Sequence, residues 1–112
     1  KICYDAGEPF TVDETINIIH EARGKAFLAH PHFLGEGEKV FKLLEKPFDG
    51  IECLYANCLP EQEKRWIKAA ERRKLLISGG SDYHGKLKPS ILLGCSWVNE
   101  EIFYRIFQHA IQ

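Results

Sequence analysis

Residues 75–85 read LLISGGSDYHG, and this stretch decides the fold. Its apolar start, residues 75–77, is typical of a buried strand, and the small residues 78–80 end that strand. Asp82 and His84 follow, two positions apart. In an extended segment, two such side chains leave the same face of the chain. The sequence therefore predicts a buried strand that ends in an acid–imidazole pair.

Other stretches have a similar plan, in which polar residues follow an apolar run. GKAFLAHPH, residues 24–32, ends in His30 and His32 on either side of a proline. DGIECLYAN, residues 49–57, ends in tyrosine, alanine and asparagine. We expect a strand in each, and a fourth strand in the apolar run ILLGCSWV at residues 91–98.

Amphipathic segments alternate with these runs. We expect helices at residues 12–23, 36–46 and 60–73, and a last helix after the cap residue Asn99. Helices that alternate with strands over short connections imply parallel strands joined by right-handed crossovers. Strands that are apolar on both faces fit a sheet that helices cover. The predicted fold class is therefore α/β.

The composition fits one globular domain or a piece of one. The chain has 112 residues, 45% of them hydrophobic, and a formal net charge of −1. This balance gives the whole chain no general attraction to nucleic acid or membranes, and no apolar run approaches the ~20 residues of a membrane span. The basic residues at 64–74 are interspersed with acidic ones, which predicts a solvated helix face.

The cysteines and the start of the chain carry two further expectations. Cys3, Cys53, Cys58 and Cys95 lack the paired spacing of a zinc site. We expect free thiols in a reducing cytoplasm rather than a disulfide framework. The start has neither an initiator methionine nor a signal-peptide core, so we expect a fragment of a longer protein.

His30, Asp82 and His84 are the candidate metal ligands. Sites in parallel α/β sheets form beyond the carboxyl ends of the strands, where the loops converge. His30 precedes a proline, which favours extended backbone there. Glycines among residues 78–80 would let the backbone approach the site closely. Imidazole and carboxylate without thiolate suit zinc, manganese or iron in a reactive site rather than a structural zinc.

Several of these residues have plainer alternatives. Asp82 could bond nearby amides in a polar turn. His32 lies just outside the ligand position and would either touch substrate phosphate or sit in an exposed loop. Glu52 is costly to bury in an apolar strand unless it faces a polar interior near the metals or pairs with Lys or Arg. His20 and His109 lie in amphipathic helices and are predicted to be packing or surface residues.

Five segments, taken in order, resemble the later half of PHP-domain (polymerase and histidinol phosphatase) proteins. They are GKAFLAHPH, DGIECLYAN, EQEKRW, LLISGGSDYHG and KPSILLG. The similarity covers about residues 8–98 and is strongest to bacterial metal-dependent phosphoesterases, among them nucleoside-bisphosphate phosphatases and short-RNA exonucleases. It implies a distorted (β/α)7 barrel, of seven βα units, with two or three metal ions at its carboxyl-end mouth and hydrolysis by a metal-activated water. By motif, His30 would be a late imidazole ligand, and Asp82 with His84 the final ligand pair.

One family element is absent from this sequence. PHP domains open with a His-x-His motif, whereas no histidine precedes His20 here. We therefore expect residues 1–112 to be the carboxyl-terminal portion of a single PHP domain that does not turn over substrate alone. A partial barrel leaves a sheet edge open, which the rest of the domain, another copy or the last helix would cover.

Three functions are compatible with this sequence. The first is a metal-dependent phosphoesterase that acts on a nucleotide, a sugar phosphate or a short oligonucleotide. The second is a non-catalytic structural or regulatory module with the same fold. The third is another metal-dependent hydrolase, such as an amidohydrolase.

Overall fold

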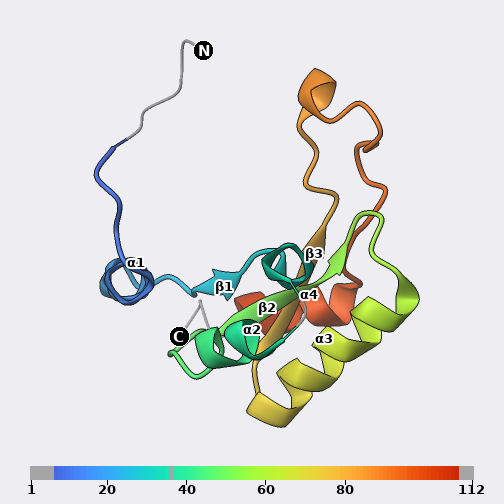
Figure 1. Ribbon diagram of the computed structural model, residues 1–112. Coiled ribbons are helices and arrows are strands. Elements are labelled where there is room, and N and C mark those ends of the chain that lie inside the picture. Colours follow the sequence, from blue (N-terminus) through green and yellow to red (C-terminus); the bar gives the residue numbers. More distant parts are fainter. Residues whose placement is uncertain (1–6, 36, 109–112) are drawn as a thin grey trace.

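The computed structural model describes residues 7–35 and 37–108. The helices and strands alternate along the chain (Figure 1). The α-helices are α1 (Val12–Glu21), α2 (Glu38–Leu43), α3 (Pro60–Arg73) and α4 (Glu100–Phe107), and the strands are β1 (Phe27–Leu28), β2 (Gly50–Tyr55) and β3 (Leu76–Gly80). Two short 3₁₀ helices, η1 (Pro31–Leu34) and η2 (Gly85–Leu87), follow β1 and β3. No helix in the described ranges is long and apolar enough to cross a membrane.

The three strands form one parallel sheet in the order β1-β2-β3, which confirms the predicted α/β class. Phe27 pairs with Gly50, and Gly50 pairs in turn with Leu76. The register between β2 and β3 shifts between Glu52 and Leu54. All three carboxyl ends therefore open on the same edge of the sheet.

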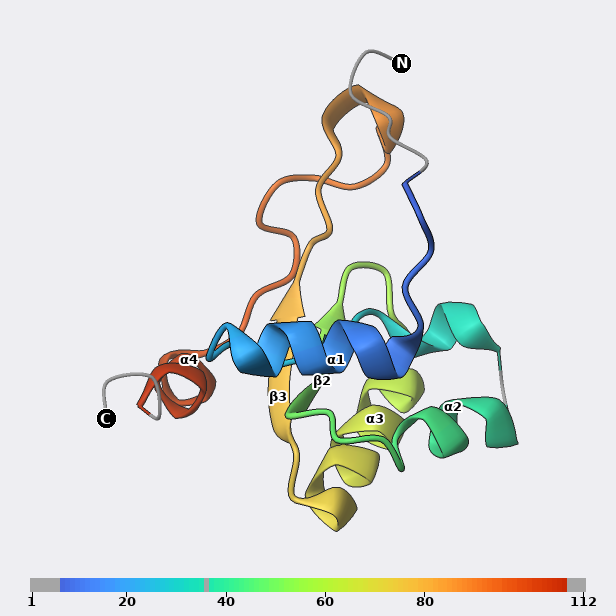
Figure 2. The ribbon, with the colours of Figure 1, turned by 90° about the vertical axis from the view of Figure 1, so that its left-hand side faces the viewer.

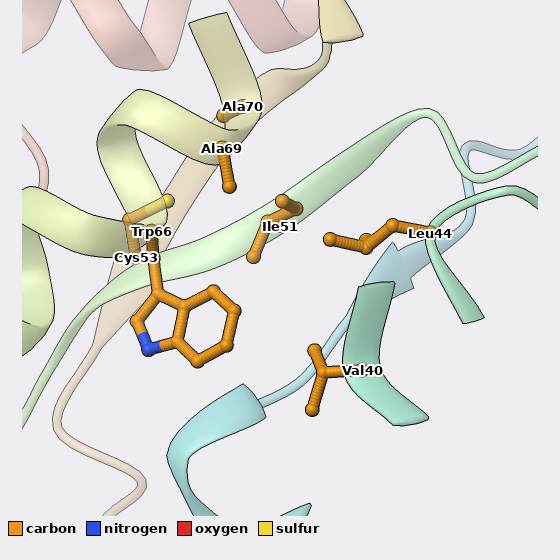
Figure 3. Close-up of a cluster of buried hydrophobic side chains, with 7 residues drawn as sticks. All are labelled: Val40, Leu44, Ile51, Cys53, Trp66, Ala69 and Ala70. Carbon is orange, nitrogen blue, oxygen red and sulfur yellow. The ribbon is translucent and has the colours of Figure 1, made fainter. Parts of the chain in front are cut away.

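One face of the sheet carries the main core. The apolar side of α3 and the short α2 pack against β2, and Figure 3 shows their side chains meeting around Ile51. Trp66 is only 2% exposed, as its place on the predicted inner side of α3 requires. The buried members of this cluster are Val40, Leu44, Ile51, Cys53, Trp66, Ala69 and Ala70.

The helix α4 lies on the opposite side of the sheet from α2 and α3, next to β3 (Figure 2). Asn99 caps it, because its side-chain oxygen accepts a 2.9 Å hydrogen bond from Ile102 N. Lys25 donates to the carbonyl of Ile106 at 2.5 Å, which ties α4 to the segment before β1. The predicted apolar stripe is only partly covered, since Phe103 remains about half exposed.

Residues 91–98 do not form the predicted fourth strand. They belong to a loop that runs from Ser81 to Val98 and rises above the carboxyl edge of the sheet (Figures 1 and 2). An apolar run becomes a strand only where a neighbour pairs with it, and among the described residues β3 has no further strand beside it. Ile91 instead packs on Tyr55 and Ala56 and anchors the loop.

The described cysteines are free thiols, as expected. Cys53 is buried in the core, but Cys95 is exposed rather than part of a strand. Cys3 lies outside the described residues.

Candidate functional site

Each strand is followed by a residue with left-handed backbone. His30 comes after β1, Asn57 after β2 and Asp82 after β3. Among the described residues five non-glycine positions have positive φ: Arg23 (60°), His30 (67°), Asn57 (59°), Lys74 (54°) and Asp82 (54°). Arg23 and Lys74 only end helices, whereas strained backbone at all three strand ends is a feature of functional sites. His, Asn and Asp are the non-glycine types that tolerate it best.

His30 does not have the extended backbone predicted from the proline that follows it. Its φ is 67° and its ψ 80°, and it directly precedes η1. The proline excludes right-handed helical geometry for the preceding residue, and here the chain turns into the left-handed region instead. The His30 ring meets Phe33 at 5.2 Å and Tyr55 at 5.9 Å between ring centroids. It therefore lies against the end of β2.

Asp82 is the centre of a hydrogen-bond network. Its Oδ2 accepts from Tyr55 OH at 2.7 Å and from Lys88 Nζ at 2.5 Å. These two bonds, that from Lys88 first, lower the pKa of the Asp82 carboxyl to about 2. The network consists of side chains from β2 and the loop, so the alternative of a turn closed by Asp82 on nearby amides is not found among the described contacts.

His84 reaches Asp82 through a turn and not through an extended segment. The left-handed backbone of Asp82 overturns the predicted extended geometry. His84 Nδ1 lies 2.6 Å from the Asp82 carbonyl oxygen and 3.5 Å from Asp82 Oδ1. Because a carbonyl only accepts, Nδ1 donates, and the Nε2 of a neutral ring then carries a lone pair. This is the form in which histidine binds a metal.

Glu52 lies on the face of β2 away from the main core. Its Oε2 is buried without a hydrogen-bond partner among the described residues, and no ion pair with Lys or Arg is found there. Burial raises the pKa of Glu52, His30 opposes this rise, and Asp82 adds to it. No pairing of Glu52 with Lys or Arg is therefore found among the described residues, and a polar interior near metal ions stays a prediction.

His32 lines a cavity of about 470 Å³ beside this network. Its ring lies 4.8 Å from the Tyr55 ring. Burial, and secondarily the neighbouring His30, lowers the pKa of His32 and favours the neutral imidazole. The cavity is lined by His32, Phe33, Tyr55, Ala56, Asn57, Leu87, Lys88, Pro89, Ser90 and Ile91.

Sequence reasoning missed Tyr55, Lys88 and Asn57 as site residues. Tyr55 is the last residue of β2, where a polar group faces the strand-end edge, and this position was a usable signal. Lys88 lies six residues after Asp82 in a loop, and no spacing rule joins the two. Among the described residues no three His, Cys, Asp or Glu side chains are arranged to hold a metal ion.

The remaining histidines have structural positions or are undescribed. His20 Nε2 lies 2.8 Å from Asp49 Oδ2, which also accepts from Ala26 N at 2.6 Å. His20 thus ties α1 to the start of β2, in keeping with its predicted packing role. His109 lies outside the described residues.

Comparison with known proteins shows what the chain is similar to. No family model matches it. It is 34% identical over 73 residues to a phosphoribosyl 1,2-cyclic phosphate 1,2-diphosphodiesterase of Eggerthella lenta, an alignment that covers 65% of this chain and 28% of that protein. It is 32% identical over 79 residues to the 5′-3′ exoribonuclease Rnm of Escherichia coli, covering 66% and 27%. These two relatives support the resemblance to PHP-domain proteins that the sequence motifs indicate.

A solved structure supports the resemblance over most of the chain. A candidate metal-dependent phosphoesterase from Bifidobacterium adolescentis superposes with a TM-score of 0.71 at 27% identity. The match covers 94% of this chain and 38% of that one. The chain spans little more than a quarter of the length of the curated relatives that it matches.

Proposed function

We propose that this chain forms part of the active site of a metal-dependent phosphoesterase. The observation that carries the proposal is the gathering of His30, Asp82 and His84 at one edge of the sheet, joined through Tyr55. The relatives are named as a diphosphodiesterase and an exoribonuclease, and both names describe phosphodiester hydrolysis. The substrate class that fits is a phosphorylated nucleotide or sugar, or a short RNA.

The proposed metal ligands are His30, Asp82 and His84. Nitrogen and carboxylate donors suit Mn, Zn or Fe, and His84 already has its Nδ1 tied to a carbonyl. Asp82 is anionic across the physiological range because its pKa is about 2. A divalent metal in such a site supplies Lewis acidity, which neutralises phosphate oxygens and activates water.

The other residues of the edge hold and neutralise charge. Tyr55 OH and Lys88 Nζ share Asp82 Oδ2, so Oδ1 is the oxygen left to face a ligand. Lys88 and His32 both line the 470 Å³ cavity, where the ammonium and the imidazole can meet a phosphate. Glu52 orients the ligands or balances their charge from behind, since both His30 and Asp82 influence the pKa of its partly buried carboxyl.

The proposed site needs residues from elsewhere to be complete. The described part of the chain offers no group of three potential ligands arranged around one point, so we propose that further ligands come from the rest of the PHP domain. Residues 1–112 would then be the carboxyl-terminal portion of that domain, inactive alone.

The decisive experiment replaces Asp82 in the full-length protein. Asp82→Asn keeps the size of the side chain but removes its charge, so we expect phosphoester turnover to fall by several orders of magnitude with the fold retained. Asp13→Asn is the matched control, since Asp13 is exposed and, among the described residues, forms an ion pair with Lys46 alone. The substrates are a cyclic phosphoribosyl phosphate, a short 5′-phosphorylated RNA and an amide. Wild-type phosphoester turnover by Asp82→Asn, or hydrolysis of the amide alone, would contradict the proposal.

One observation favours a second candidate, a non-catalytic module. The Lys88 ammonium already neutralises Asp82 as a structural ion pair would. This alternative predicts that the full-length protein binds no divalent metal and that Asp82→Asn only loosens the loop.

A further inference from the structure

The outer face of α3 has a cationic groove that the proposed active site does not use. A cavity of about 440 Å³ lies between α3 and Phe41 of α2. Seven residues line it: Phe41, Glu61, Lys64, Arg65, Lys68, Ala69 and Arg72. Four of them are cations and one is a carboxylate, although the whole chain has a net charge of −1. The positive charge is therefore concentrated on this face.

The cations of the groove are unpaired. Within the described ranges, none of the ion pairs closer than 4.0 Å includes a side chain of α3. Glu61 lies three and four residues before Lys64 and Arg65, at helix positions that favour pairing, yet it pairs with neither. Several neighbouring cations that no carboxylate neutralises are available to bind an anionic ligand.

The aromatic side chains hold part of the groove in place. The Arg65 guanidinium lies 5.6 Å from the Phe41 ring and 5.1 Å from the Trp66 ring, and that of Arg73, outside the groove lining, lies 5.3 Å from the Phe41 ring. Phe41 packs on the main core. The guanidinium groups are thus pre-oriented by rings that the fold itself fixes, which lowers the entropy lost when they bind a ligand.

The spacing of the cations indicates a repeating anion. Lys64, Lys68 and Arg72 follow one another at four-residue intervals, so they form a row along α3 with one charge at about every 6 Å. A single phosphate would need cations that converge on one point, whereas a row matches a chain of phosphates. We propose that the groove between α2 and α3 binds the backbone of single-stranded RNA. The proposal rests on the proposed function for its choice of a phosphodiester polymer.

The position of α3 allows one strand to reach both sites. The helix begins at Pro60, only a few residues after Asn57 at the carboxyl edge, and runs away from that edge along the sheet (Figure 1). An RNA with one end in the candidate active site could therefore continue onto the groove. The groove would bind the backbone without regard to base sequence.

The test measures RNA binding by the full-length protein, with metal chelated so that no cleavage occurs. The probe is a fluorescently labelled, 5′-phosphorylated single-stranded RNA, and its affinity is measured by anisotropy between 50 and 200 mM salt. The variant is Lys64→Gln with Lys68→Gln, two exposed lysines without described contacts to the core. Losing two phosphate contacts should reduce the slope of log affinity against log salt by about 1.4. Between 50 and 200 mM salt, this smaller slope means that the affinity of the variant falls by a factor roughly sevenfold smaller than that of the wild type.

The control removes two cations on another face. Arg23 follows α1 and Arg105 belongs to α4, so both lie away from the groove. The double variant Arg23→Gln with Arg105→Gln should leave the slope of log affinity against log salt unchanged. A slope that stays the same in the lysine variant, or falls equally in the control, would overturn the proposal. Equal competition by polyglutamate would show a general anion surface and overturn it as well. Turnover of a mononucleotide ester by the lysine variant reports on the active site separately, so a failure of the groove is distinct from a failure of the phosphoesterase assignment.

Discussion

Gly79 lies where β3 packs closely against β2. A methyl group there would stand 2.5 Å from both Cβ and the carbonyl oxygen of Leu54, at the irregular register between Glu52 and Leu54. The small residues of this stretch were predicted to let the backbone approach the metal site. Gly79 instead permits two strands to approach each other, and the site gains from it indirectly, because β3 then delivers Asp82 next to Tyr55.

Replacing Gly79 by alanine should therefore destabilise the protein. We expect Gly79→Ala to lower the free energy of unfolding by about 1–3 kcal/mol, the usual effect of forcing extra volume into a packed position. Gly80→Ala is the matched control, because a methyl group at Gly80 would meet nothing within 4 Å. Urea unfolding monitored by circular dichroism measures both. Equal stability of the two variants would mean that the strands have room at Gly79.

Glu52 should make stability depend on pH. Its pKa is raised in the folded state, mainly by burial, so the folded protein holds this proton more tightly than the unfolded chain. Below the ordinary pKa of about 4.5 both states are protonated and nothing is lost. As the pH rises above it, the unfolded chain ionises first and stability falls, until the pH passes the raised pKa.

The Glu52→Gln variant lacks this ionisation. We expect wild-type protein to lose stability relative to Glu52→Gln between pH 4 and pH 7, measured by urea unfolding with metal chelated. A constant difference between the two proteins at both pH values would show that Glu52 ionises equally easily in the folded and unfolded states.

At the scale of elements, α3 was predicted from the sequence with its observed bounds, Pro60–Arg73. A proline suited to the first turn and a regular apolar side are local signals, so sequence alone specifies the helix. The apolar run at residues 91–98 was wrongly predicted to be a strand, because strand formation depends on a pairing partner, which is not a local property. The turns at His30 and Asp82 were missed for a similar reason: positive φ in a non-glycine residue is set by the surrounding fold.

The Asn99 cap is a local signal that can be tested at this scale. Asn99→Ala removes the acceptor for Ile102 N and should lower the free energy of unfolding by about 1 kcal/mol. Asn99→Asp keeps an acceptor at the same place and should retain the stability. Thermal unfolding compares the two variants, and an equal loss in both would show that the side-chain oxygen does not stabilise α4.

At the scale of the whole molecule, the carboxyl edge remains open. Large apolar side chains on the loop that rises above it are exposed, among them Leu92 (71%), Leu93 (78%) and Trp97 (70%). Exposed apolar surface of this kind marks an interaction face, and the PHP-domain relatives are several times longer than the aligned region. We expect the rest of the domain to cover this loop and to complete the ligand set. The complete ligand set of the proposed metal site therefore could not be predicted from this sequence.

We propose that His30, Asp82 and His84, which the described residues do not arrange around one point, bind a common metal ion once the rest of the domain is present. A crystal structure of the full-length protein loaded with Zn²⁺ or Mn²⁺, with the ion located by anomalous scattering, measures this directly. We expect an ion within about 2.0–2.2 Å of a nitrogen of each imidazole and of a carboxylate oxygen of Asp82. An ion bound elsewhere, or one at this edge without those three side chains, would contradict it.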